Sequence, residues 1–506
     1  MEDSAYSQTR IAKNTIILGL RMLFTLAVSL YTSRVVLDVL GVEDYGLYNI
    51  VGGIVILLSV ISSTMRNASQ RFITYELGRG NPQQVSEVFS MSMIAHFAIG
   101  LVIIILGETA GLWYVQCRLN IPPGRETAAL VVYQLSLLTM VLTLVRSPYD
   151  ASVIAHEKMG FFAVMCVVDV LLKLAAVFLL NLTGWDKLIF YTALILLINI
   201  AVFFCYHIFC TRKLDTCRFR FVIKKDYFRR LFGFLGWSLL GSSASLGTQQ
   251  AGNLIINRFL GVAVNAAYGV ANQVNAAINS FVSSFQVAFT PQIVKLYSQQ
   301  RYKESFRLAN SSALLSYYIL LILAFPILAN IDYVMGVWLV EVPQYAGIFC
   351  SLLIVYSLID ALQAPLWILI NASGDIRAYE IWLSVILLLN IPFSYIALKN
   401  GWQPYWVLAI RVILNLVTAI CRCFHVKVRL GYPMREYLKK VVARAALATA
   451  IVLALAAVFP APASYASFWG FLLYCAISVL VTVAVILLAG LNKEEKDILV
   501  SLLKAI

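Results

Sequence analysis

The chain alternates long apolar runs with short polar connections. We count about fourteen runs, each long enough to cross about 30 Å of hydrocarbon as an α-helix. The predicted spans are residues 14–40, 45–68, 85–111, 127–152, 161–181, 188–210, 231–258, 265–294, 309–330, 347–372, 379–398, 404–425, 441–460 and 468–490. No connection is long enough for a soluble catalytic domain. The pattern predicts an all-α integral membrane protein with about fourteen transmembrane helices.

Composition agrees with this interpretation. Of 506 residues, 61% are hydrophobic and only 13% are charged, whereas soluble domains carry about 25% charged residues. The net charge of +14 would suggest nucleic-acid binding in a soluble protein. In a membrane protein the side of the membrane on which the cations lie explains such an excess. We therefore expect no nucleic-acid partner.

The basic residues lie almost entirely on one side of the predicted topology. With the N-terminus in the cytoplasm, 28 Lys and Arg residues fall in inner segments, and the outer loops hold only Arg118, Arg125, Lys187 and Lys399. Positive charge resists translocation and is attracted to the anionic inner leaflet. Both termini are therefore predicted to be cytoplasmic.

The longest basic connection follows the sixth span and divides the chain. We predict four regions: an N-terminal lobe at 1–210, a basic cytoplasmic linker at 211–230, a C-terminal lobe at 231–425, and two extra helices with a cytoplasmic tail at 426–506.

The two lobes share sequence landmarks. Gly41 at the end of span one matches Gly261 at the end of span seven, 220 residues later, and Pro148 in span four matches Pro365 in span ten, 217 residues later. A shift of six spans preserves orientation, so the sequence predicts a parallel repeat of two six-helix lobes. Such repeats are typical of transporters, in which one lobe moves against the other around a central substrate site.

Ionisable residues within predicted spans are candidate functional groups, because a charge at the bilayer centre is costly. Asp169 and Lys173 in span five are four residues apart, a spacing that allows them to pair on a helix. The pair either neutralises itself or supplies a cation to a cavity. Asp169, and Asp360 beside Pro365 in span ten, are candidates for H⁺ or Na⁺ coupling; for Asp360 a local hydrogen-bonded kink is the alternative.

Four arginines are candidates for binding an anionic substrate. Arg21, Arg34, Arg66 and Arg258 lie at different depths, and arginine offers a planar fork that matches phosphate oxygens. Snorkelling to the nearest interface is the alternative. Arg21 and Arg34 are about 220° apart on an ideal helix, so both face one cavity only if span one bends.

Amides are concentrated in spans seven and eight. They indicate a hydrophilic path for sugars, although hydrogen bonds between helices also explain some of them. The candidate sugar-path residues are Gln249, Gln250, Asn253, Asn272 and Asn275.

No catalytic, metal or cofactor motif is found. The chain has no P-loop and no HExxH motif. Cys421, Cys423 and His425 do not share one face of a helix, so no metal site is predicted. The sequence indicates a transporter and not an enzyme.

The N-terminal stretch carries a family resemblance. It reads RIAKNTIILGLRMLFTLAVSLYTSRVVLDVLGVEDYGLYNIVGGI and then ASQRFITYELGRGN. This resembles Wzx-type oligosaccharide flippases, the polysaccharide biosynthesis exporters of the multidrug/oligosaccharidyl-lipid/polysaccharide (MOP) superfamily, most clearly over residues 10–85.

The resemblance implies alternating-access transfer of a polyprenyl-diphosphate-linked oligosaccharide across the bacterial cytoplasmic (inner) membrane for surface polysaccharide biosynthesis. It implies diphosphate binding by Arg21, Arg34 and Arg66, with Arg258 as a weaker match. Lys173 is added to the candidate cations because of its depth in span five and not because of the resemblance. The expected partners are the lipid-linked oligosaccharide, membrane lipids and glycan-assembly proteins. Two departures matter. Typical members have twelve spans, whereas fourteen are predicted here. The multidrug branch often places a cation-binding carboxylate within span one, whereas the only carboxylate in span one here, Asp38, is near its outer end, which disfavours a multidrug exporter. The alternatives are a cation-coupled multidrug exporter of the same superfamily and a non-transporting scaffold of a glycan-assembly complex.

Overall fold

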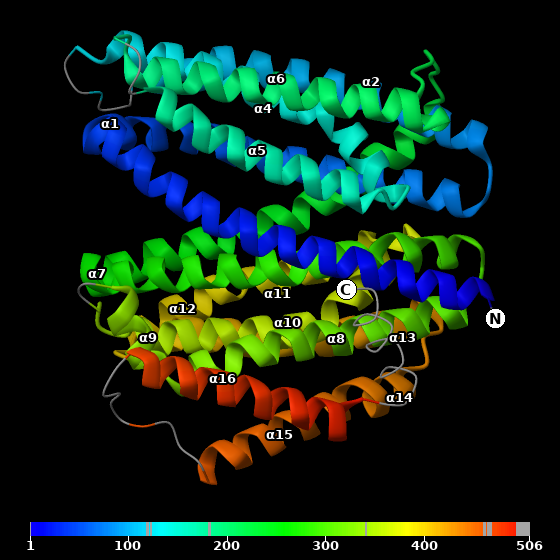
Figure 1. Cartoon of the computed structure of the whole chain (residues 1–506), viewed down its shortest axis with the longest axis vertical. Coiled ribbons are helices and arrows are strands. Elements are labelled where there is room, and N and C mark those ends of the chain that lie inside the picture. Colours follow the sequence, from blue (N-terminus) through cyan, green and yellow to red (C-terminus); the bar gives the residue numbers. More distant parts are fainter. Residues whose placement is uncertain are drawn as a thin grey trace. The chain divides into compact units, whose positions relative to one another are not determined.

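The computed structural model describes residues 2–117, 121, 124–180, 184–339, 342–458, 462 and 468–491. This part of the chain is helical and contains no strand, which confirms the predicted all-α class. Contacts divide the chain into two compact units, Ile16–Leu239 and Leu240–Ile506 with Met1–Thr15. We call them the N unit and the C unit (Figure 1).

The N unit is built from most of α1 and the next five helices. Its main elements are α1 (Glu2–Gly78), α2 (Pro82–Leu106), the π-helical turn η1 (Gly107–Gly111), α3 (Leu112–Cys117), α4 (Glu126–Ala155), α5 (Met159–Leu179), α6 (Lys187–Lys213) and the 3₁₀ turn η3 (Asp215–Cys217). Helix α4 packs against α2 and α6, and α5 also packs against α6. Helix α4 is therefore the centre of this unit.

The C unit contains most of α7 and the later helices. These are α7 (Lys225–Ser298), α8 (Tyr302–Ala329), α9 (Ile331–Trp338), α10 (Ala346–Ser373), α11 (Arg377–Leu388), α12 (Asn390–Lys399), α13 (Trp406–Leu430), α14 (Met434–Tyr437), η4 (Leu438–Val442), α15 (Ala443–Val458), α16 (Phe468–Val485) and η5 (Ile486–Gly490). Helix α10 packs against α8 and α13, as α4 packs against α2 and α6. The same pairing recurs six spans later, as a parallel repeat requires.

Two long helices each merge two predicted spans across a glycine. Gly41, with φ 78° and ψ 170°, interrupts the helical backbone of α1, and Gly261, with φ 80° and ψ −174°, interrupts that of α7. This backbone region is essentially restricted to glycine. The landmark glycines of the sequence repeat are therefore the positions at which the chain turns from one span to the next.

Eleven helices of the described chain are long and apolar enough to cross a membrane. The predicted spans 45–68, 231–258 and 265–294 are not among them, although these residues are helical in α1 and α7. The two spans in α7 are rich in amides and small residues, which lowers their apolar content. The count of fourteen spans therefore stays a prediction.

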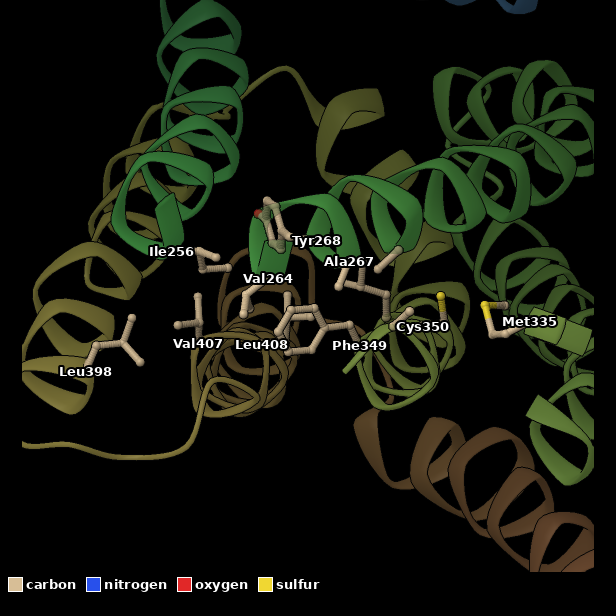
Figure 2. Close-up of a cluster of buried hydrophobic side chains, with 13 residues drawn as sticks. Ile256, Val264, Ala267, Tyr268, Met335, Phe349, Cys350, Leu398, Val407 and Leu408 are labelled. Carbon is tan, nitrogen blue, oxygen red and sulfur yellow. The ribbon is translucent and has the colours of Figure 1, made fainter. Parts of the chain in front are cut away.

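A buried apolar cluster joins the predicted outer ends of the C-unit helices. It contains Phe349, Cys350, Val407 and Leu408 together with Ile256 and other residues of α7 on both sides of Gly261 (Figure 2). In water, each Å² of apolar surface buried contributes about 25 cal/mol to the stability of the fold. Within lipid the same contacts act mainly through close packing. The cluster holds the two arms of α7 against α10 and α13.

The two C-terminal helices are attached to α8. The Tyr317 hydroxyl lies 2.6 Å from the hydroxyl of Thr449 on α15, and the Tyr318 hydroxyl donates to the Gly490 carbonyl at 3.0 Å. A Cβ at Gly490 would lie 2.7 Å from the Tyr318 hydroxyl. Helices α15 and α16 are therefore fixed to the C unit by polar contacts as well as by apolar packing.

An ion-pair cluster closes the predicted outer end of the N unit. Arg125 pairs with Asp44, just after the Gly41 turn, and with Asp186. Asp186 also caps α6 through the backbone N–H groups of Leu188 and Ile189. Burial opposes the charge on Arg125, but the hydrogen bonds and charges of the two carboxylates outweigh it and raise its pKa. The cluster ties three segments of the N unit together.

Candidate functional site

The interior of the N unit holds a group of charged side chains that starts at Arg21. Arg21 Nη1 donates to Cys166 Sγ at 3.2 Å, and the guanidinium lies over the ring of Phe162 at 5.2 Å from its centroid. Both partners belong to α5. Arg21 is half-buried on the N-terminal arm of α1, where a guanidinium is stabilised by an aromatic face. The predicted cation of span one therefore points towards α5.

A second pair lies on α4. Arg146 Nε is 3.4 Å from Asp150 Oδ2, and both side chains are largely buried. Arg66 and Asp169 also interact electrostatically with the Asp150 carboxylate. Asp150 therefore links Arg66 of α1 to residues of α4 and α5.

Lys173 completes the group. Its Nζ donates to Asp169 Oδ2 at 2.7 Å, as the four-residue spacing predicts, and both side chains keep partial exposure. Asp150 and Asp169 are within electrostatic reach of the Cys166 thiol, beside Arg21. We call these six charged residues the N-unit cluster: Arg21, Arg66, Arg146, Asp150, Asp169 and Lys173. It contains four cations and two carboxylates and so carries an excess of positive charge.

Arg146 and Asp150 were not among the candidates from the sequence. A signal was present, because both lie inside the predicted span 127–152, four residues apart and on either side of Pro148. Residues at this spacing share one helix face, and the proline interrupts the backbone ladder between them. Charge pairs that flank an intramembrane proline are therefore a useful search criterion.

The C unit holds a different cluster around Arg422. Arg422 is buried on α13; its Nε and Nη2 donate to the Tyr379 hydroxyl at 2.9 and 2.6 Å, and Nη1 donates to the Gln363 carbonyl at 3.1 Å. Tyr379 lies on α11, and Gln363 precedes Pro365 on α10. One guanidinium thus joins three helices through charge-assisted hydrogen bonds.

Asp360 lies in the same region. Arg422 and Arg411 both interact electrostatically with its carboxylate, and Gln363 Nε2 lies 3.4 Å from its Oδ1. The same Gln363 nitrogen donates to Asn415 Oδ1 at 2.6 Å. The carboxylate is therefore engaged by two cations and an amide.

The candidate sugar-path amides divide into two groups. Gln249 donates to Asn272 at 3.4 Å across the two arms of α7, and buried Asn275 accepts from Ser357 of α10 at 2.9 Å. These three residues form hydrogen bonds between helical segments. Gln250 is exposed and Asn253 is half-buried. Gln249 and Asn272 are also half-buried, so Asn275 is the buried amide of the set and Gln250 is the most exposed.

Arg34 and Arg258 are exposed on α1 and α7. The non-helical residue in α1 is Gly41, beyond Arg34. Arg21 and Arg34 therefore lie about 220° apart on one helical segment. Because the helix breaks after Arg34 and not between the two arginines, the break does not bring them to one cavity. Arg258 belongs to the other unit. A role for Arg34 or Arg258 in substrate binding stays a prediction.

The described residues contain no group of three or more side chains arranged to hold a metal ion. The His425 ring packs against the rings of Tyr379 and Trp382, with centroid distances of 5.7 and 6.2 Å. Cys421 and Cys423 are partly buried free thiols.

A family model described as polysaccharide biosynthesis protein matches residues 11–297. This is more than half of the 506 residues. The chain belongs to the polysaccharide biosynthesis protein family. The family match begins before the N-unit cluster and extends through both arms of α7, so it covers Arg21 and the glycines at both turns.

Solved structures of transporters share the fold of this chain. A crystal structure of a MATE point mutant gives a TM-score of 0.73 at 12% identity and covers 85% of this chain and 99% of the other. An outward-facing multidrug resistance MATE family transporter of the MOP superfamily gives a TM-score of 0.71 at 14% identity and covers 84% of this chain and 97% of the other. The family member therefore has the fold of MATE transporters of the MOP superfamily, as the sequence resemblance predicts.

The same fold occurs with different pocket charges. A MOP superfamily transporter from Pyrococcus furiosus, whose description reports reversed polarity of the binding pocket and suggests a different function, gives a TM-score of 0.70 at 13% identity, over 85% and 98%. A search of curated proteins found no significant match. The charges of this chain's own residues must therefore carry the argument about substrate.

Proposed function

We propose that the protein transfers a polyprenyl-diphosphate-linked oligosaccharide from the inner to the outer leaflet of the bacterial cytoplasmic membrane by alternating access. The observation that carries the proposal is the positive excess of the N-unit cluster. Four cations face two carboxylates inside a membrane-spanning unit, and a diphosphate supplies the negative charge that would balance them. Membership in the polysaccharide biosynthesis protein family supports a glycan as the attached group.

Arg21 and Arg66 are the proposed diphosphate ligands. Arg21 is anchored by Phe162 and Cys166 and is only half-buried. Arg66 is also half-buried, and it interacts electrostatically with Asp150. Arg146 is more tightly held by Asp150, so its role is to keep that carboxylate in place. Charge-assisted hydrogen bonds contribute about 1.5–3 kcal/mol each.

The test is a flipping assay in proteoliposomes. A lipid-linked oligosaccharide with a fluorescent sugar is incorporated, and transfer is followed by loss of fluorescence to a membrane-impermeant quencher. We expect R21A/R66A to slow transfer at least about tenfold, the change that corresponds to 1.4 kcal/mol. Arg79→Gln is the matched control, because Arg79 is exposed and pairs with Glu76. Equal transfer by wild type and R21A/R66A would remove the diphosphate assignment.

A multidrug exporter is the second candidate, because similar structures are described as MATE transporters, one of them a multidrug resistance protein. The same proteoliposomes distinguish the two: an exporter would move a lipophilic cation and leave the lipid-linked glycan in place. A non-transporting scaffold would move neither. The excess of cations in the N-unit cluster disfavours a cationic substrate.

Coupling to H⁺ or Na⁺ is proposed for Asp169 or Asp360. Asp169 is paired with Lys173, and Asp360 interacts with Arg411 and Arg422. A coupling cation would therefore compete with a protein cation for each carboxylate. Transfer rates measured with an imposed proton or sodium gradient, in wild type and in Asp169→Asn and Asp360→Asn, test each site separately.

A further inference from the structure

The segment between α6 and α7 is an exposed, strongly basic strip. Residues 212–230 contain eight Lys and Arg against Asp215 and Asp226. Helix α6 ends at Lys213 and α7 begins at Lys225, so the non-helical part is short. Its core, residues 218–225, reads RFRFVIKK. Cations and apolar side chains alternate over residues 218–221, and two apolar residues and two lysines follow.

This strip is attached to α2 along its length. Ser86 Oγ donates to the Arg218 carbonyl at 3.3 Å, and the Arg220 N–H donates to Ser90 Oγ at 3.0 Å. Lys224 pairs with Glu87. Its backbone is therefore held in place independently of the arginine and phenylalanine side chains.

The attachment points set the depth of the strip. Helix α2 begins at Pro82, so Ser86 and Ser90 lie about 6 and 12 Å along it at 1.5 Å per residue. On the predicted topology this end of α2 is cytoplasmic. Each headgroup region of a bilayer is several ångströms thick. From the predicted topology we therefore expect the strip to lie at the level at which headgroups meet the hydrocarbon.

Three large apolar side chains of the strip lie open on the surface of the described chain. Phe219, Phe221 and Ile223 are 54%, 76% and 62% exposed. They occupy alternate positions of a non-helical segment, and residues two apart in an extended chain share one face. Aromatic side chains are favoured at the membrane interface. Arg218, just before Phe219, and Arg220, between Phe219 and Phe221, are also exposed.

We propose that residues 218–225 form an interfacial anchor that binds anionic phospholipid headgroups of the cytoplasmic leaflet. Phe219, Phe221 and Ile223 enter the interface, while Arg218, Arg220 and Lys225 bind the phosphates. Each cation near an anionic leaflet is attracted to it electrostatically. This proposal does not depend on the identity of the transported substrate. It makes this segment of the N unit responsive to the lipid composition of the inner leaflet.

The test is hydrogen–deuterium exchange of the full-length protein in two kinds of nanodisc. One contains phosphatidylcholine alone, and the other contains equal parts of phosphatidylcholine and phosphatidylglycerol. We expect peptides covering residues 216–226 to exchange at least about tenfold more slowly in the anionic nanodisc, the change that corresponds to 1.4 kcal/mol. High salt should remove most of the difference.

Variants separate the charge from the fold. R218Q/R220Q should exchange like wild type in phosphatidylcholine, because the serine contacts use backbone atoms, and should lose most of the protection in the anionic nanodisc. K439Q/K440Q, which removes two exposed cations of the C unit, should leave the linker protection unchanged. F219S/F221S should reduce protection in the anionic nanodisc.

Three results would overturn the proposal. One is equal exchange of the wild-type linker in both nanodiscs, and another is full anionic protection in R218Q/R220Q. The third is protection that appears only when a soluble protein is added, which would show that the strip binds a protein. None of these results depends on transport, so failure of the anchor and failure of the flippase assignment are distinguishable.

Discussion

Gly41 and Gly261 adopt the same backbone conformation 220 residues apart, with φ near 80° and ψ near 180°. Each is the break in its long helix. Apart from the adjoining residues and the local helix backbone, no atom of the described chain lies within 4 Å of a Cβ built at either glycine. Backbone conformation and not space therefore requires glycine at both turns, and the internal repeat is defined by two residues with one shared function.

Gly41→Ala and Gly261→Ala should each destabilise the protein. Any Cβ is strained in this region of φ/ψ space, at a cost of about 1–3 kcal/mol. Thermal unfolding in detergent measures the effect. Gly19→Ala and Gly247→Ala are matched controls, since both positions are helical with open space around the Cβ. The controls should be neutral or slightly stabilising. Unchanged midpoints in Gly41→Ala and Gly261→Ala would contradict the conformational argument.

Tyr379→Phe should destabilise the C unit by about 1.5–3 kcal/mol. The substitution keeps the ring but removes the acceptor of two hydrogen bonds from the buried Arg422 guanidinium, and an unsatisfied charged donor carries this penalty. Thermal unfolding is again the measurement. Tyr395→Phe is the control, because the ring of Tyr395 packs on Phe259 and is partly exposed. Equal loss in both variants would show that Arg422 finds another acceptor.

Asp150→Asn should be among the more damaging single changes in the N unit. It leaves Arg146 and Arg66 without the carboxylate they share, and breaking a buried ion pair by removing one partner costs about 3–5 kcal/mol. Asp215→Asn provides the comparison: its pair with Arg218 is exposed, and such pairs contribute at most about 1 kcal/mol. The yield of folded protein and the unfolding midpoint are the readouts. Tolerance of Asp150→Asn would mean that water or lipid phosphate reaches the cluster.

Arg125→Gln should weaken the predicted outer end of the N unit to a smaller extent. Arg125 is one-third exposed, so solvent screening limits each of its two pairs to about 1 kcal/mol or less. The stability difference from wild type should shrink in 1 M salt, where the Debye length is about 3 Å. Lys399→Gln, on the same predicted side, is the control. A salt-independent difference would point to lost packing of the arginine stem.

The helical class, the positions of most spans and the repeat were predictable because each depends on local sequence. Apolar runs set where helices cross the membrane, and Gly41 and Gly261 are visible as matched landmarks. Helix α7 is different. Its spans carry so many amides that composition alone does not identify them as membrane helices, yet Asn275 and Gln249 are satisfied by hydrogen bonds across helical segments.

The candidate site was predicted only in part. Arg21, Arg66, Asp169 and Lys173 were found by asking which charges lie within apolar runs, and the structure places them in one cluster. The hub of that cluster, Asp150, was missed because it lies near the inner end of its span, where a charge is cheap and attracts no notice. Its importance depends on neighbours from α1 and α5 that are far away in the sequence.

Membrane class, expected orientation and family resemblance thus follow from the order of residues along the chain, since hydrophobic length and the distribution of cations act locally. Which charges meet is a different matter. Arg21 contacts α5, Arg422 joins α10 to α11, and the basic strip is held against α2. Those pairings depend on how helices far apart in the sequence pack, and helix packing is a property of the folded chain alone.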